Sequence, residues 1–290
     1  MTLNNEEDLL RLKEIGRICA NALQAMGEAL EPGITTAELD AIGRKVLEEA
    51  GARSAPELCY NFPGATCISV NEEIAHGIPG GRVIKAGDLV NIDVSAEKDG
   101  IFADTGASFP VPPVTAAIDR LCRDGKRAMW VGLKQVRPDQ PLAAIGNAIG
   151  DFARKNRYSL VTNLASHGIG RSLHEEPTEI ATWPDPRERR RMTDGMVFTV
   201  EPFLSMGAQW AEGGNDDWTL YSDPRAPTVQ YEHRRRHPRR TAGGDAAGLN
   251  RGYGGLQPPS SSDDFFFIAA VHDLPPGCGV SHLSGGGLSH

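Results

Sequence analysis

The sequence predicts an α+β fold made of two similar halves, and three observations lead to this prediction. Helical and strand-like patterns occupy separate blocks of the 290-residue chain. In each half, two helical segments precede segments that have the character of antiparallel strands. The dipeptide Asp99-Gly100 joins two such strands directly, which is a strong hairpin signal. The repeated order of elements indicates an internal duplication.

The first half begins with two helices. Apolar side chains recur every three or four residues over 4–30, which predicts an amphipathic helix, and Pro32-Gly33 follows its end. Thr35, with Glu38 three residues later, forms a capping-box pattern. We therefore expect a second helix over 35–49.

The remaining elements follow from the same kinds of pattern. Strands are expected over 89–98 and 101–109, on either side of the Asp99-Gly100 turn. Farther along, the patterns predict helices over 114–133 and 138–156 and strands over 159–166, 196–204, 217–222 and 227–233. Each half thus supplies helices that can cover an antiparallel sheet.

Composition and charge argue against several classes of protein. A formal net charge of −8 disfavours general nucleic-acid binding, which usually requires a basic surface. No apolar run approaches the length of a membrane span, and the first residues lack the apolar core of a signal peptide. The five cysteines are odd in number and scattered, so a disulfide framework is not expected. We expect a cytoplasmic protein.

Acidic side chains occur where strands are predicted. Asp93 alternates with the apolar residues of its strand and so points to the opposite face, and Asp104 lies in the partner strand. Two carboxylates close across a hairpin repel each other unless a proton or a cation lies between them. Glu201 lies in an apolar run, and Glu232 lies in the last predicted strand.

These four acids and His167 could act together. Hard carboxylates with a single imidazole suit a pair of divalent cations such as Mn, Fe, Co or Zn. A structural zinc site would instead require Cys or more His ligands. From spacing alone, a two-metal site and a set of solvated acids both remain open.

Five motifs then carry a family resemblance. They are AHGIP (75–79), NIDVSAEKDGIFADTGASF (91–109), SHGIGRSLHEEP (166–177), FTVEPF (198–203) and VQYEH (229–233). In order and spacing they closely resemble the type I methionine aminopeptidases. The resemblance spans about residues 5–233 and implies the pita-bread fold, in which two pseudo-symmetric halves surround a dinuclear metal centre.

The resemblance assigns a role to each candidate ligand. It implies that Asp93 holds one divalent metal ion (Co, Mn, Fe or Zn), that His167 and Glu201 hold the other, and that Asp104 and Glu232 bridge the two. Metal ions in such a site would activate a water for attack on the scissile carbonyl. Glu201 is then also the expected proton shuttle to the leaving amine.

Further residues match the family's catalytic and binding positions. His174 resembles the histidine that touches the substrate and stabilises the tetrahedral intermediate, and His76 resembles the one near the next amide. The resemblance also implies a methionine pocket walled by Cys59, Tyr60, Phe62, Cys67, Leu173 and Trp218. A monovalent cation or supporting position is expected at Asn71, Ser108 and Thr199.

The function implied is removal of the initiator methionine from nascent polypeptides whose second residue is small. We expect a monomer that acts transiently near the ribosome and binds neither membranes nor specific nucleic acids. A proline-specific aminopeptidase or prolidase of the same fold is one alternative, although those enzymes usually carry a long extra N-terminal domain. A catalytically impaired pita-bread binding protein is the other.

The sequence changes character at His233. Residues 234–290 show almost no periodicity, so we expect a catalytic domain over 1–233 and a disordered tail of non-native appearance over 234–290. With plausible codons, a change of reading frame directly after His233 turns the next residues into TVVVTRGGPLVVT, the family's usual ending. A frameshift is therefore our hypothesis for the tail, and sequencing the gene tests it.

Overall fold

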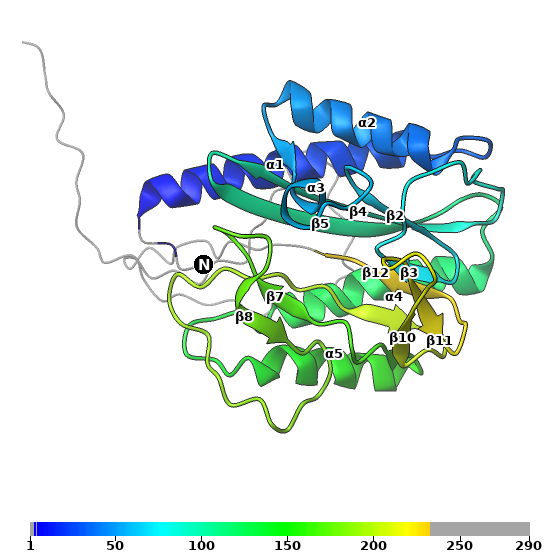
Figure 1. Ribbon diagram of the computed structural model, residues 1–290. Helices are drawn as coiled ribbons and strands as arrows, with labels where there is room; N and C mark the ends of the chain where they lie inside the picture. The colour runs from blue at the N-terminus through cyan, green and yellow to red at the C-terminus, as the bar shows by residue number, and fades with distance from the viewer. Residues whose placement is uncertain (1–2, 4, 233–290) are drawn as a thin grey trace, which may run out of the picture.

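A computed structural model describes residue 3 and residues 5–232 of the chain (Figure 1). The tail predicted over 234–290, and the change of frame predicted directly after His233, lie outside the described residues. No helix among the described residues is long and apolar enough to cross a membrane.

The helices of the first half form where the sequence predicts them. Helix α1 covers Glu6–Ala29, and the Asn5 side chain caps it by accepting a hydrogen bond from the backbone of Asp8. Helix α2 covers Thr36–Glu49 and begins with the predicted capping box. A short helix that the sequence patterns did not predict, α3 (Ala55–Tyr60), follows these two.

The predicted hairpin is the longest paired element of the fold. Strands β4 (Leu89–Lys98) and β5 (Ile101–Pro110) pair along their whole length. Their turn at Asp99-Gly100 has positive φ angles of 52° and 78°, as a tight hairpin turn requires. Strands β1 (Arg53–Ser54) and β2 (Cys67–Val70) also pair with β4, which completes a four-stranded antiparallel sheet.

The second half contains helices α4 and α5 and shorter strands. Helix α4 covers Ala116–Leu133, and α5 covers Ala143–Asn156, so α5 begins later than the predicted helix over 138–156. One sheet has the strand order β12-β9-β6, a second pairs β7 with β8, and a third has the order β10-β11-β3. The strand bounds are β3 Glu73–Ala75, β6 Ser159–Leu160, β7 Ser166–Gly168, β8 Glu175–Ile180, β9 Phe203–Ser205, β10 Trp210–Gly213, β11 Leu220–Asp223 and β12 Thr228–Gln230.

Two predicted strands differ from the structure. The one expected over 159–166 is split between β6 and β7, and the one expected over 196–204 keeps regular strand pairing only in β9. The second difference has a local cause, because Pro202 has no N–H for a strand ladder. The N–H of Glu201 is also diverted, since it donates to the hydroxyl of Ser166.

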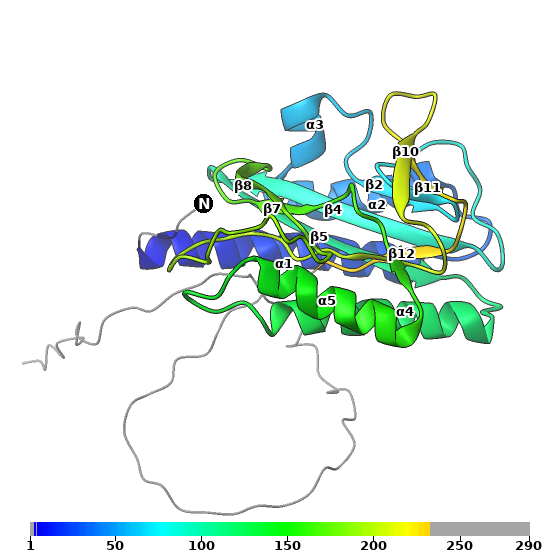
Figure 2. The ribbon, with the colours of Figure 1, turned by 90° about the horizontal axis from the view of Figure 1, so that it is seen from below.

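The long helices cover one face of the strands. Helix α1 packs on β4 and β5, and α4 packs on β5, β9 and β12, while α2 and α5 lie beside α1 and α4 respectively (Figure 1). Figure 2 shows α1, α4 and α5 along one side of the strands, with α3 and the β10–β11 hairpin on the other. The two halves meet where Tyr231 forms a bridge with Ala107 of β5.

Candidate functional site

The long hairpin places two carboxylates on one face. Asp104 pairs with Ser95, and Asp93 pairs with Gly106, so the two aspartates are diagonal neighbours on the same side of the sheet. The backbone N–H of Glu232 donates to the carbonyl of Gly106 at 2.9 Å and brings the end of the second half to this point. Carboxylate oxygens of Asp93, Asp104 and Glu232 lie within 4.8 Å of one another.

The second half adds an imidazole and a fourth carboxylate. The Nε2 atom of His167 lies 3.8 Å from Oδ2 of Asp104 and 3.5 Å from Oε1 of Glu201. Its Nδ1 lies 3.0 Å from the carbonyl oxygen of Gly168, an acceptor that fixes the proton on Nδ1 in the neutral ring. The lone pair of Nε2 therefore faces the carboxylates.

Buried hydroxyl groups hold these two side chains. The Thr199 hydroxyl donates to Oε1 of Glu201 at 2.6 Å and accepts from the backbone N–H of His167 at 3.1 Å. The Ser166 hydroxyl accepts from the N–H of Glu201 at 3.0 Å. Thr199 is fully buried, so these bonds compete with little water.

A cavity of about 410 Å³ opens onto this cluster. Its lining includes most of the predicted site, namely Tyr60, Phe62, Cys67, His76, Asp93, Asp104, His167, Leu173, His174, Glu201 and Trp218. Glu232 belongs to the carboxylate cluster but does not line the cavity. Cys59 does not line it either and is exposed, because neighbouring residues on a helix such as α3 point about 100° apart.

The cavity also contains residues that the sequence patterns did not reveal. Its remaining lining residues include Ser95, Asn163, Thr178 and Phe203. Ser95 could have been found, because it lies two residues after Asp93 and so faces the same side of β4. In the wall, the rings of Phe62 and Trp218 meet edge to face with their centroids 5.2 Å apart.

Residues 11–234 match the family model described as Metallopeptidase family M24. The chain belongs to this family. It is 45% identical over 234 residues to a protein named methionine aminopeptidase from Staphylococcus epidermidis, covering 80% of this chain and 93% of that one.

Solved structures of a methionine aminopeptidase and a prolidase have a fold similar to that of this chain. A methionine aminopeptidase from Rickettsia prowazekii has a TM-score of 0.76 and 33% identity, with 80% of this chain and 94% of that chain covered. A prolidase from Pyrococcus furiosus has a TM-score of 0.64 and 19% identity, and the match covers 80% of this chain and 61% of that one. The prolidase similarity shows the fold alone. The predicted pita-bread fold is confirmed.

The site of this M24 metallopeptidase has an excess of negative charge that fits bound metal ions. Among the described residues that line the cavity, none is Lys or Arg. The Oδ1 atom of Asp104 is buried and accepts no hydrogen bond within the described part of the chain. Clustered carboxylates of this kind need a proton or a cation between them. Four carboxylates and one imidazole are the donor set that divalent Mn, Fe, Co or Zn accept.

Two histidines, His76 and His174, line the cavity of the metallopeptidase. Burial lowers the pKa of His76, and the neighbouring His174 lowers it further, although Asp104 opposes both effects. Burial also lowers the pKa of His174, again partly offset by Asp104. Both residues line the cavity and are exposed to solvent there, which weakens the effect of burial. At neutral pH we therefore expect neutral imidazoles, which can donate hydrogen bonds from one nitrogen.

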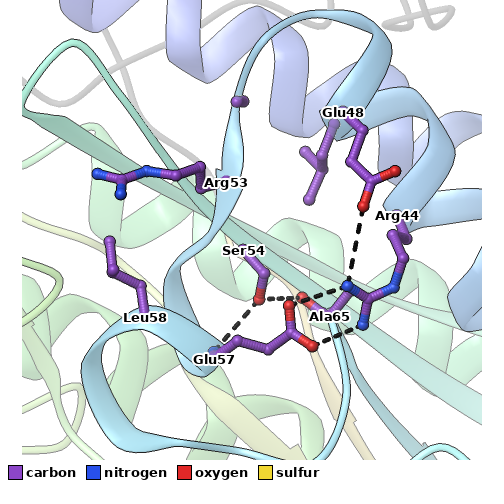
Figure 3. A pocket seen from close by; sticks show the side chains of 9 residues that line it. Arg44, Glu48, Arg53, Ser54, Glu57, Leu58 and Ala65 are labelled. Carbon is purple, nitrogen blue, oxygen red and sulfur yellow. Dashed lines mark hydrogen bonds and ion pairs between the residues drawn. The ribbon is translucent and has the colours of Figure 1, made fainter.

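The helix that carries Tyr60 is anchored from its far side. A second cavity, of about 350 Å³, lies between α2 and α3 (Figure 3). There the guanidinium group of Arg44 donates to both carboxylate oxygens of Glu57, at 2.6 and 3.0 Å. The Ser54 hydroxyl caps α3 at the N–H of Glu57 and donates to the carbonyl of Ala65. These bonds tie α3 to α2 and to the segment that leads into β2.

The three residues predicted for a monovalent cation have separate partners. The side chain of Asn71 bonds to Asp88 and to the backbone of Leu89. The Ser108 hydroxyl bonds to Gln230, whereas Thr199 bonds to His167 and Glu201 as described. The monovalent cation stays a prediction.

Proposed function

We propose that this chain is a metal-dependent methionine aminopeptidase, which removes the N-terminal methionine of polypeptides whose second residue is small. The observation that carries the proposal is one cavity lined by two contrasting sets of side chains. Carboxylates with His167 form one set, and apolar and aromatic side chains form the other. A peptide N-terminus needs both, because its side chain must be bound while its first peptide bond is hydrolysed.

The apolar set suits a methionine side chain. Phe62 and Trp218 supply the edge-to-face aromatic pair, and Cys67 and Leu173 supply sulfur and aliphatic surface. A flexible, polarizable thioether packs favourably against aromatic rings. Burial and the nearby Asp93 and Asp104 raise the pKa of the Cys67 thiol, which therefore stays neutral and apolar at physiological pH.

The acidic set would hold two divalent metal ions. We assign Asp93 to one ion, His167 and Glu201 to the other, and Asp104 and Glu232 to both. The short distances among these side chains support the assignment. Bound ions of this type lower the pKa of a water and polarise a carbonyl group. Co, Mn, Fe and Zn all suit the donor set.

The chain's own residues then direct the proton and the substrate. The Glu201 carboxylate, oriented by the Thr199 hydroxyl, would take a proton from the attacking water and deliver it to the leaving amine nitrogen. His174 would donate a hydrogen bond to the scissile carbonyl oxygen as negative charge develops there. His76 would bind the amide that follows.

We place this activity in a catalytic unit over residues 1–233. We propose that the unit acts as a monomer in the cytoplasm, on the methionine of nascent chains close to the ribosome. Co-sedimentation with translating ribosomes, and the molecular mass in solution, test these two points separately from the chemistry.

The central experiment offers the metal-loaded protein three kinds of peptide. We expect cleavage of Met-Ala-Ser, little cleavage of Met-Leu-Ser, and none of a peptide that begins Xaa-Pro, where Xaa is a residue other than Met. In Asp104→Asn the rate should fall by more than about a hundredfold, because even residues that only support a metal ligand change activity by roughly that factor.

A matched control comes from the same hairpin. Asp99→Asn also removes one carboxylate, and asparagine tolerates the positive φ of 52° at that turn, so the rate should not change. Cleavage of the Xaa-Pro peptide alone would replace the proposal with a proline-specific aminopeptidase. No metal-dependent cleavage of any peptide would indicate a catalytically impaired pita-bread binding protein.

A further inference from the structure

A hydrogen bond joins the proposed methionine pocket to a proposed catalytic histidine. The Oη atom of Tyr60, the last residue of α3, lies 2.5 Å from Nδ1 of His174, which directly precedes β8. The two rings are tilted by 52°, with their centroids 5.6 Å apart. Tyr60 therefore contacts His174 through its hydroxyl group and not through a stacked face.

The ring of His174 is restrained from a second direction. The His167 ring lies beside it, with centroids 4.0 Å apart and an interplanar angle of 45°. Ring packing of this kind limits the tilt of an imidazole but does not distinguish its two nitrogens. Only a directional hydrogen bond can decide which nitrogen faces the cavity and which one carries the proton.

Tyr60 stands on a fixed support. Its helix is tied to α2 by the two Arg44–Glu57 bonds and is capped by Ser54 (Figure 3). At its other end, Asn61 takes the left-handed conformation and stops the helix directly after Tyr60. The hydroxyl group is thus held where His174 meets it, although Tyr60 as a residue is 44% exposed.

We propose that Tyr60 is a positioning residue, whose hydroxyl donates to Nδ1 of His174 and so keeps the proton of that imidazole on Nε2. Within the described part of the chain, Nδ1 of His174 is the hydrogen-bond partner found for the Tyr60 hydroxyl. A phenol that donates to Nδ1 leaves that nitrogen as an acceptor. Nε2, on the other side of the ring, then keeps the N–H that a developing oxyanion requires.

This inference rests on the proposed function for its catalytic meaning, but the hydrogen bond can be tested without any activity. Tyr60 then has two roles, as a wall of the pocket and as a positioning residue, and a substitution can separate them. A pocket wall needs only the aromatic ring, whereas the positioning role needs the hydroxyl group. Tyr60→Phe removes the second and keeps the first.

The first experiment measures the tautomer directly. Metal-free protein with ¹⁵N-labelled histidine is studied by NMR above the ordinary pKa of histidine, and His174→Gln identifies the resonances of His174. We expect a protonated Nε2 and a bare Nδ1 in the unmodified protein, and a mixture of both tautomers in Tyr60→Phe. A protonated Nδ1 in the unmodified protein, or identical tautomers in the two proteins, would overturn the proposal.

The second experiment measures kinetics on Met-Ala-Ser with the metal-loaded protein. We expect Tyr60→Phe to lower kcat by about tenfold, as loss of a supporting hydrogen-bond partner does, with KM changed by less than about twofold. In a His174→Gln background, Tyr60→Phe should cause no further loss, because the hydroxyl acts only through that ring.

Controls separate the possible failures. Tyr158→Phe removes another tyrosine hydroxyl, one that bonds to Asp124 away from the cavity, and should keep full activity. A higher KM with unchanged kcat in Tyr60→Phe would reduce Tyr60 to a wall residue and overturn the proposal. An unmodified protein that cleaves no peptide would instead contradict the proposed function, and the tautomer measurement would still decide the hydrogen bond.

Discussion

The two halves of the molecule hold their proposed ligands in different ways. In the first half, Asp93 and Asp104 stand on two ten-residue strands that pair in unbroken register. In the second half, His167 lies in a three-residue strand, and Glu201 lies outside the regular strands altogether. The same kind of side chain is thus presented by a long backbone ladder on one side and by short, irregular segments on the other.

Side-chain hydroxyls supplement a short run of backbone bonds in the second half, where the N–H of Thr199 donates to the carbonyl of His167 at 2.8 Å. The Thr199 hydroxyl bonds to both His167 and Glu201, and the Ser166 hydroxyl holds the backbone of Glu201. A ladder distributes positional control over many backbone bonds, which every residue type except proline can make. A hydroxyl network concentrates that control in a few side chains. We therefore expect the second half to be more sensitive to small substitutions.

The largest expected effect tests this comparison with two glycines. A Cβ atom at Gly168 would lie 2.5 Å from the backbone oxygen of Glu176, whereas at Gly106 the nearest atoms would be those at the end of the Gln230 side chain. Since a backbone moves less easily than a side chain, Gly168→Ala should cost about 3 kcal/mol of unfolding free energy and Gly106→Ala about 1 kcal/mol. Urea unfolding of the metal-free proteins measures both values. Equal costs, or a larger cost at Gly106, would show that the halves tolerate crowding alike.

An intermediate effect is expected from the hydroxyl network itself. Thr199→Val keeps the side-chain shape but removes a donor to Glu201 and an acceptor for the N–H of His167. We expect metal affinity to fall by about ten- to a hundredfold, the usual effect of losing a group that supports a ligand. Titration calorimetry with Mn²⁺ measures the change.

The chain contains a matched control for this substitution. Thr182 is also fully buried, but its hydroxyl has no hydrogen-bond partner among the described residues. Thr182→Val should therefore leave metal affinity unchanged and stability unchanged or slightly higher. If both variants bound metal as well as the unmodified protein, the hydroxyls of the second half would not be positioning its ligands.

The strength of the local signal explains how much of the fold the sequence could predict. Helices α1 and α2 and the β4–β5 hairpin have complete local signals, namely periodicity, caps and a turn dipeptide, and all were predicted. Helix α3 has a local start signal, because Ser54 caps it at the N–H of Glu57, but its six residues are too few to show a periodicity. Strand β8 is mostly polar and so lacks the apolar alternation that predicts a strand.

In the candidate site too, the sequence predicted only the residues that have a local signal. Asp93 and Asp104 could be placed on one face from alternation alone, and Glu201 was conspicuous as an acid in an apolar run. The bonds from Thr199 to His167 and from Tyr60 to His174 join residues 32 and 114 positions apart. No spacing rule predicts contacts at such separations, and they become visible only when the fold is known.

The smallest expected effect concerns pH and the two histidines. The pKa values of His76 and His174 are lowered in the folded protein, mainly by burial, from an ordinary value of 6.5. As pH falls through 6.5, the unfolded chain therefore binds protons before the folded one does. The stabilising contribution is fully present above that pH and is lost as pH falls toward the lowered values. We expect the melting temperature of the metal-free protein to drop accordingly.

A double variant isolates this contribution from that of the carboxylates. His76→Asn suits the positive φ of 54° at that position, and His174→Gln keeps a polar side chain in the second half. Both proteins retain Asp93, Asp104 and Glu232, so these acids respond to pH in each of them. We expect a shallower decline of melting temperature below pH 6.5 in the double variant, because it has lost the two groups whose protonation favours unfolding. Parallel curves would mean that solvent entering the cavity hydrates both rings well enough to remove the effect of burial.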